Sequence, residues 1–219
     1  MIVNELEKLK NSVIVDIDNF RNEHLNDKEF IKYVIDFSER GGAKGFLSKS
    51  LSNLNILKKF TSLPIFAEIE ENFNDILIAK TYDNFKKIVD LKPNFIIIDM
   101  SIFEDKFKDL QKLVKELRFN FDGELVARIS TKEQAFEAYR LGIDALMVEI
   151  FGYCFDESIV FEVCSDINIP TIASLNSVDF DQGKKLLENG VNIFVLGEDV
   201  TNPNVVIKRF RKNRNYTFV

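Results

Sequence analysis

The sequence predicts a single-domain (β/α)₈ barrel that spans residues 1–219 and begins with a short helix. Eight short apolar runs alternate with longer segments of helical periodicity. Several runs are apolar at successive positions, as is typical of parallel strands covered on both faces. No Pro- or Ser-rich linker divides the chain, and 46% hydrophobic residues provide ample material for one core. A closed barrel of eight βα units satisfies these observations together.

The elements follow in order along the chain. Strands are expected at residues 13–17, 45–47, 64–68, 95–99, 124–128, 145–149, 171–174 and 193–197. Helical patterns between them include residues 110–119, 132–141 and 181–188. The segment Ser130-Thr131-Lys132-Glu133 is typical of a capping box at a helix start. Strands that alternate with helices imply right-handed βαβ units and a parallel sheet.

Glycines stand just before several of the expected strands. Gly42, Gly142 and Gly190 each follow a helical pattern, where glycine can close a helix in the left-handed conformation. An open doubly wound sheet is the alternative fold. That fold usually carries a glycine-rich loop after its first strand, and here Asp18-Asn19-Phe20-Arg21 has no glycine. The barrel is therefore favoured over the open sheet.

Composition excludes several classes of function. The net charge of −6 and the sequence pI of about 5.1 argue against nucleic-acid binding, which needs a basic surface. No stretch approaches the ~20 apolar residues of a membrane span. Cys154 and Cys164 match no zinc or redox spacing, so we expect free thiols in a reducing compartment. We expect a cytoplasmic protein with no membrane partner.

In such a barrel, function lies at the carboxyl ends of the strands. Those ends carry mostly carboxylates, and Arg128 is the cation among them. They are solvated rim residues and helix caps, a paired acid/base site, or a site for a hard cation. No ligand spacing specific to a metal is present, so no metal residues are assigned. The strand-end residues are Asp18, Leu47, Glu68 or Glu70, Asp99, Arg128, Glu149, Ser174, and Gly197 with Glu198 and Asp199.

The end of the last strand is where barrels of this class often bind phosphate. Gly197 allows close backbone approach, but Glu198 and Asp199 follow at once. Two unit charges ~4 Å apart interact by about 4 kcal/mol at an effective dielectric of ~20. An unshielded Glu198 at this loop would therefore oppose a phosphate group.

Short motifs spread from Arg40 to Phe210 carry a family resemblance. They include Gly41-Gly42-Ala43-Lys44-Gly45-Phe46, Ala127-Arg128-Ile129-Ser130-Thr131, Ile169-Pro170-Thr171-Ile172-Ala173 and Gly197-Glu198-Asp199-Val200-Thr201-Asn202-Pro203. In order and spacing, the chain resembles bacterial N-acetylmannosamine-6-phosphate 2-epimerases. The resemblance implies a (β/α)₈ barrel of carbohydrate metabolism, a homodimer, and proton transfer at the carbon bearing the N-acetyl group without any cofactor.

The resemblance also implies which residues should carry the reaction, and most are replaced. The family's catalytic lysine falls at Glu70, and its glutamate falls at Ser174. Further family positions fall at Asp18 for a glutamine, Leu47 and Asn202 for arginines, Arg128 for an aspartate and Glu198 for a small residue. A carboxylate at position 70 cannot supply the positive charge that a lysine lends to a developing enolate. Asp99, Tyr153 and Gly197 are among the positions that are kept.

These replacements lead to a set of candidate residues. The lysine-to-glutamate and aspartate-to-arginine changes suggest a charge swap, so we expect Glu70 and Arg128 to form an ion pair across the barrel mouth. The catalytic candidates are Glu70, Asp99 and Arg128. The substrate-binding candidates are Asp18, Glu149, Tyr153, Ser174, Gly197 and Glu198.

Three functions follow from the sequence. The first is a family member without the ancestral epimerase activity that acts as a binding or interaction protein, with a small-molecule ligand at the mouth. The second is an active sugar-phosphate epimerase with relocated acid/base groups, such as Glu70 with Asp99. The third is a sensor or scaffold whose acidic mouth takes a cation or an amine. Aromatic residues exposed on outer helices would mark an oligomer interface.

Overall fold

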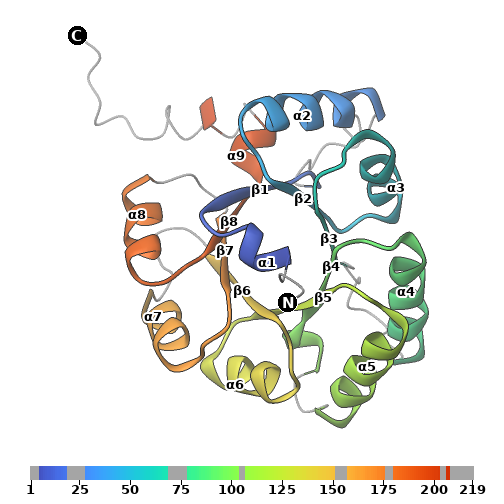
Figure 1. Ribbon diagram of the computed structural model, residues 1–219, viewed down its shortest axis with the longest axis vertical. Helices are drawn as coiled ribbons and strands as arrows, with labels where there is room; N and C mark the ends of the chain where they lie inside the picture. The colour runs from blue at the N-terminus through green and yellow to red at the C-terminus, as the bar shows by residue number, and fades with distance from the viewer. Residues whose placement is uncertain are drawn as a thin grey trace.

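The computed structural model describes residues 5–18, 28–68, 78–103, 107–150, 157–175, 180–202 and 206–207. Eight parallel strands close into a barrel in sequence order, and β8 pairs with β1 to complete it. Helices surround the barrel, and Figure 1 looks down it with the short helix α1 across its centre. The predicted (β/α)₈ barrel with a short N-terminal helix is therefore confirmed.

The element bounds agree with the expected ones to within a few residues. The strands are β1 Ser12–Asp16, β2 Gly45–Ser48, β3 Ile65–Ala67, β4 Phe95–Asp99, β5 Glu124–Ile129, β6 Ala145–Ile150, β7 Thr171–Leu175 and β8 Ile193–Leu196. The helices are α1 Glu5–Lys8, α2 Lys28–Arg40, α3 Leu51–Phe60, α4 Ile78–Leu91, the 3₁₀ helix η2 Met100–Phe103, α5 Phe107–Asn120, α6 Lys132–Arg140, α7 Glu157–Asp166, α8 Phe180–Glu188 and α9 Glu198–Thr201.

The turns into three strands depend on glycine. Gly42, Gly142 and Gly190 have φ angles of 96°, 74° and 99°, in the left-handed region expected for them. The start of α6 differs in detail from the expected capping box. Thr131 is the N-cap and accepts a hydrogen bond from the Gln134 N–H, while the Gln134 side chain, rather than that of Glu133, accepts from the Ser130 N–H.

The barrel interior is an apolar core distinct from the core between strands and helices. Every second strand residue points inward, and side chains from alternate strands form layers in such barrels. Gly45 leaves room for this packing, since an added Cβ would lie 2.8 Å from Ile14 Cδ1. The inward side chains are Ile14, Leu47, Phe66, Phe95, Ile97, Val126, Ala145, Met147, Ile172, Ile193 and Val195, with Leu6 and Leu9 below them.

Helix α1 closes the amino-terminal end of the barrel. The Glu124 carboxylate accepts hydrogen bonds from the backbone N–H groups of Glu5 (2.8 Å) and Leu6 (3.2 Å). Glu5 in turn accepts a 2.8 Å hydrogen bond from the Asn94 side-chain amide. These contacts hold Leu6 in the barrel interior, where it is fully buried.

We predict that Leu6→Ala lowers the free energy of unfolding by about 3 kcal/mol, because the barrel strands cannot collapse into the cavity left behind. Urea denaturation measures this loss. The control is Phe119→Ala, whose side chain is 89% exposed. The control should change stability by less than about 0.5 kcal/mol. Equal losses in the two variants would contradict the role of α1 as an interior plug.

Candidate active site at the barrel mouth

A polar layer lies above the apolar layers of the barrel interior. Asp16, Glu68, Arg128 and Ser174 each stand two residues after an inward-pointing apolar residue, at Ile14, Phe66, Val126 and Ile172 respectively. All four belong to odd-numbered strands or, for Glu68, to the residue directly after β3. Alternate strands contribute to one layer, so these side chains form the floor of the mouth at the carboxyl ends of the strands.

Arg128 is the centre of this layer. Its guanidinium forms ion pairs with Glu68 through Nη2 and with Glu149 through Nη1. The side chains of Arg128 and Glu68 are only 11% and 5% exposed, and that of Glu149 is 26% exposed. The bridge therefore links the end of β3 to β6 through β5, and two carboxylates neutralise the guanidinium charge.

The Arg128 Nε atom is left out of this bridge. It is buried and has no hydrogen-bond partner among the described residues. Nε and Nη2 lie on the same edge of a guanidinium, the edge that can grip an oxyanion with two parallel hydrogen bonds. Here Glu68 accepts from Nη2 alone, so half of this edge is unused.

Burial raises the pKa of the Glu68 carboxyl to about 7. The nearby charges of Arg128 and Lys49 act against this rise, while Asp99 and Asp16 add to it. The cost of removing a carboxylate from water thus outweighs the attraction of its partners. Glu68 is therefore a carboxyl that changes charge near neutral pH.

Asp16 shares the same environment. Burial raises its pKa to about 6, and the charge of Lys49 and the Asp18 backbone N–H act against the rise. The Asp18 N–H donates a 2.9 Å hydrogen bond to Asp16 Oδ1. Asp16 was not among the site residues expected from the sequence, because Asp18 is the residue that directly follows the expected strand. Counting every second residue from Ile14 would have found it.

Asp18 anchors the loop that follows β2. Its carboxylate accepts hydrogen bonds from the Ser48 hydroxyl (2.7 Å), the backbone N–H groups of Lys49 and Ser50, and the Asn53 side-chain amide (2.6 Å). Four donors around one carboxylate fix the loop that carries Lys49. The described donors to Asp18 therefore make it an anchor of the β2–α3 loop.

Asp99 and Ser174 complete the strand ends that face the mouth. Asp99 accepts hydrogen bonds from the backbone N–H (2.9 Å) and hydroxyl (2.7 Å) of Ser101, so it caps the 3₁₀ helix η2. Ser174 stands beside Glu149 in the β6–β7 register. At neutral pH a serine hydroxyl lacks the pKa of an acid/base group, so Ser174 needs an adjacent base to transfer protons.

The end of β8 is acidic where a phosphate loop would need donors or cations. Gly197 is buried and precedes α9, whose first turn carries Glu198 and Asp199. The Thr201 hydroxyl donates a 3.1 Å hydrogen bond back to the Gly197 carbonyl. Carboxylates at this helix start suit the helix dipole but repel a phosphate group.

Several residues named from the sequence lie outside the described residues. They are Glu70, Tyr153 and Cys154. The expected Glu70–Arg128 ion pair therefore stays a prediction, whereas the described partners of Arg128 are Glu68 and Glu149. Within the described residues, the carboxylates that face Arg128 across the mouth are therefore those of Glu68 and Glu149.

The described residues were also searched for a metal site, a membrane-spanning helix and cysteine pairs. Within them, no group of three His, Cys, Asp or Glu side chains is placed to hold a metal ion. No helix in the same part of the chain is long and apolar enough to cross a membrane. Cys164 is a half-buried free thiol, and burial raises its pKa.

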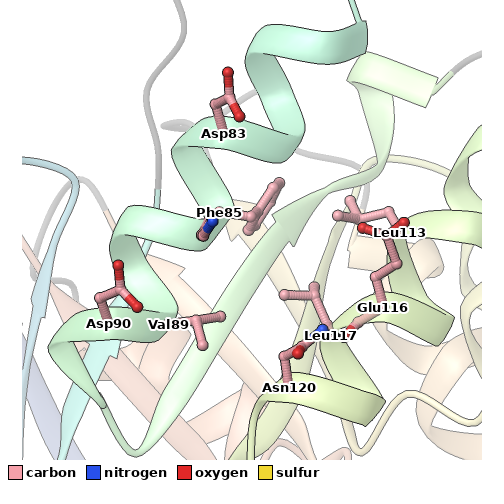
Figure 2. Close-up of a pocket in the computed structure, with 9 residues that line it drawn as sticks. Asp83, Phe85, Val89, Asp90, Leu113, Glu116, Leu117 and Asn120 are labelled. Atoms are coloured by element: carbon pink, nitrogen blue, oxygen red, sulfur yellow. Dashed lines mark hydrogen bonds between the residues drawn. The ribbon is translucent and has the colours of Figure 1, made fainter.

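Hollows on the outer surface are separate from the mouth. A groove of about 480 Å³ runs between α4 and α5, where Figure 2 shows Phe85 and Val89 facing Leu113 and Leu117 across the helix pair. Its rim carries Asp83, Asp90 and Glu116 from the same two helices. This groove belongs to the helix layer and has no strand-end group of the mouth in its lining.

A second hollow is apolar and has a volume of about 670 Å³. It lies against α2, β1, β8 and α9, with Val13, Val15 and Leu196 of the strands in its lining. The Tyr33 and Phe37 side chains at its edge stack on each other, with ring centroids 6.4 Å apart, and are 62% and 65% exposed. Exposed aromatic side chains on an outer helix are the feature expected at an oligomer interface.

The fold is a single-domain (β/α)₈ barrel, and the carboxyl ends of its strands form the candidate functional face. Residues 31–215 match the NanE family model, described as "Putative N-acetylmannosamine-6-phosphate epimerase". The match covers most of the chain, and the chain belongs to this family.

Individual relatives agree with this assignment. The chain is 27% identical to a protein of Oceanobacillus iheyensis named "Putative N-acetylmannosamine-6-phosphate 2-epimerase", over 94% of this chain and 99% of the relative. It is 28% identical to a protein of the same name from Clostridioides difficile, over 94% and 97% of the two chains.

A solved structure is similar in fold. The N-acetylmannosamine-6-phosphate 2-epimerase from Clostridium perfringens superposes with a TM-score of 0.81 at 23% identity, and the match covers 97% of each chain. At this identity the likeness supports the fold alone. The resemblance expected from the sequence motifs is confirmed by the family match.

We predict that Asp16→Asn flattens the pH dependence of stability. The pKa of Asp16 is raised to about 6, so the folded protein binds more protons than the unfolded chain between the two pKa values. Stability from this group is therefore present at low pH and is lost as the pH rises through 6. By the same linkage, the wild-type protein should lose about 2 kcal/mol more than Asp16→Asn between about pH 4.5 and about pH 7.5.

Urea unfolding at the two pH values measures this difference. Asparagine keeps an oxygen that can accept the Asp18 N–H, so the variant changes charge with little change of shape. Asp122→Asn, at an exposed position, is the matched control and should keep the wild-type slope. Parallel slopes for wild type and Asp16→Asn would show that Asp16 is not a buried, neutralised carboxyl.

Proposed function

We propose that this family member has lost the ancestral epimerase activity and serves as a binding protein with a small-molecule ligand at the barrel mouth. The observation that carries the proposal is the position of Arg128 between Glu68 and Glu149. A sugar phosphate that enters the mouth meets a guanidinium whose charge is already neutralised, so it gains little from the strongest cation there.

The charges around Arg128 support the same conclusion. The carboxyls of Asp16, Asp99, Glu68 and Glu149 outnumber the two cations at the described strand ends and their loops, Arg128 and Lys49. The first turn of α9 adds Glu198 and Asp199 where phosphate would dock. Like charges ~4 Å apart cost about 4 kcal/mol at an effective dielectric of ~20, enough to lower the affinity for a phosphate ester by several hundredfold.

The replaced residues support loss of proton transfer as well. In the family that the chain resembles, a lysine and a glutamate carry the proton from one face of the sugar to the other. This sequence has Glu70 and Ser174 at those positions. Neither a lysine ammonium at 70 nor a carboxylic acid at 174 is available to stabilise an enolate or return a proton.

A second candidate function is an active epimerase with a relocated base. Glu68 favours it, because a carboxyl with a pKa of about 7 is well suited to accept and donate protons near neutral pH. The buried position of Glu68 and its ion pair with Arg128 oppose this role, since the carboxylate would have to leave its partner to reach a substrate carbon.

We further propose that the protein works in the cytoplasm as a homodimer, without cofactor, nucleic acid or membrane. The stacked, exposed Tyr33 and Phe37 beside an apolar hollow support an interface on α2, because large apolar patches are uncommon on monomers. The acidic composition supports the absence of a nucleic-acid partner.

The experiment is an epimerisation assay with N-acetylmannosamine 6-phosphate in deuterium oxide, followed by proton NMR of the hydrogen on the carbon that bears the N-acetyl group. We expect no deuterium incorporation above the rate without protein. The C. perfringens epimerase is the positive control. Incorporation at enzymatic rates would overturn the proposal. If Glu68→Gln then abolished this activity, the second candidate function would take its place.

A further inference from the structure

The Nε–Nη2 edge of the Arg128 guanidinium can bind an oxyanion, but in this structure the Glu68 carboxylate accepts a hydrogen bond from it. Nη2 donates to Glu68, and Nε on the same edge is buried without a partner among the described residues. Nη1 on the other side is held separately by Glu149. Removing the Glu68 charge would therefore free the whole Nε–Nη2 edge while Glu149 keeps the guanidinium in place.

The charges that act on Glu68 come from four other strands or the loops that follow them. Asp16 lies on β1, Lys49 follows β2, Asp99 ends β4 and Arg128 lies on β5. Glu149 on β6 reaches Arg128 from the far side, and the neighbouring β7 contributes the neutral Ser174. With Asp16, Glu68, Asp99 and Glu149 ionised, the set carries two more negative than positive charges. Protonation of Glu68 removes one of the charges that repel an anion and breaks its ion pair with Arg128.

We propose that Arg128 is a concealed anion-binding site that Glu68 covers when ionised and uncovers when protonated, with phosphate or a phosphate ester as the ligand class. The guanidinium edge would then hold two oxygens of the anion through Nε and Nη2, with Lys49 as a second cation nearby.

The environment of Glu68 places this change near neutral pH. Burial raises the pKa of its carboxyl to about 7, so the group is ionised in mildly basic solution and neutral in mildly acidic solution. The inference rests on the proposed function, in which the mouth binds phosphate weakly because Glu68 is ionised and pairs with Arg128. It adds a condition, mild acidity, under which the same mouth accepts an anion.

The test uses inorganic sulfate, whose charge stays constant over this pH range, and isothermal calorimetry on the full-length protein. We expect wild-type affinity to rise about tenfold or more from about pH 8.5 to about pH 6.5, with a midpoint near the Glu68 pKa. Glu68→Gln should bind sulfate equally well at both pH values, about as tightly as wild type in acid. Arg128→Met should not bind it at either.

Glu149→Gln is the matched control. It also removes a carboxylate from Arg128, but it leaves Glu68 in place, so the pH dependence should remain. The inference would be overturned by wild-type sulfate affinity that does not change with pH, or by a pH dependence near 7 that survives in Glu68→Gln.

A second measurement uses only the wild-type protein, so it does not depend on whether the variants fold. The ¹⁵N resonance of Arg128 Nε in the wild-type protein should titrate with a midpoint near the Glu68 pKa, and a flat profile would contradict the inference. These readouts are independent of catalysis. Deuterium exchange into the sugar would overturn the proposed function, whereas pH-independent sulfate binding would overturn only the concealed anion site.

Discussion

The ion-pair bridge of Glu68, Arg128 and Glu149 is the interaction that most constrains the charges at the mouth of this barrel. It lies directly above the apolar layers of the interior, so its charges are largely removed from water. Buried ion pairs of this kind contribute little net stability, but the loss of one partner leaves a charge uncompensated. The bridge therefore fixes the positions of the charged groups at the mouth but adds little to the free energy of unfolding.

Much of the fold could be predicted from the sequence because the spacing of apolar residues and the positions of glycines indicate the same strand and helix boundaries. The runs at 95–99 and 124–128 became β4 and β5 almost unchanged, and Gly142 and Gly190 adopt the expected left-handed conformation. Barrel closure followed from the count of βα units and the lack of a linker. The capping of α6 by Gln134 was missed, since a Glu and a Gln one residue apart both suit a helix start.

The site was predicted less well than the fold. Arg128 and Glu149 were expected at the mouth, but the expected partner of Arg128 was Glu70, which lies outside the described residues. From the sequence alone, residues two apart would share one face of an extended strand, so the choice between Glu68 and Glu70 depends on where β3 ends, and it ends at Ala67. Nor could the sequence show that Asp18 would be surrounded by donors of the β2–α3 loop, because that contact joins residues about 30 positions apart.

A double-mutant cycle on Arg128→Met and Glu68→Gln tests the central claim most directly, since it measures the energetic coupling between the two side chains by urea unfolding. If the guanidinium is committed to Glu68, each single variant should be destabilised and the double variant should recover part of the loss, with a coupling of about 2 kcal/mol or more. Losses that simply add, within about 0.5 kcal/mol, would show that Arg128 and Glu68 act independently and that the mouth keeps a free cation.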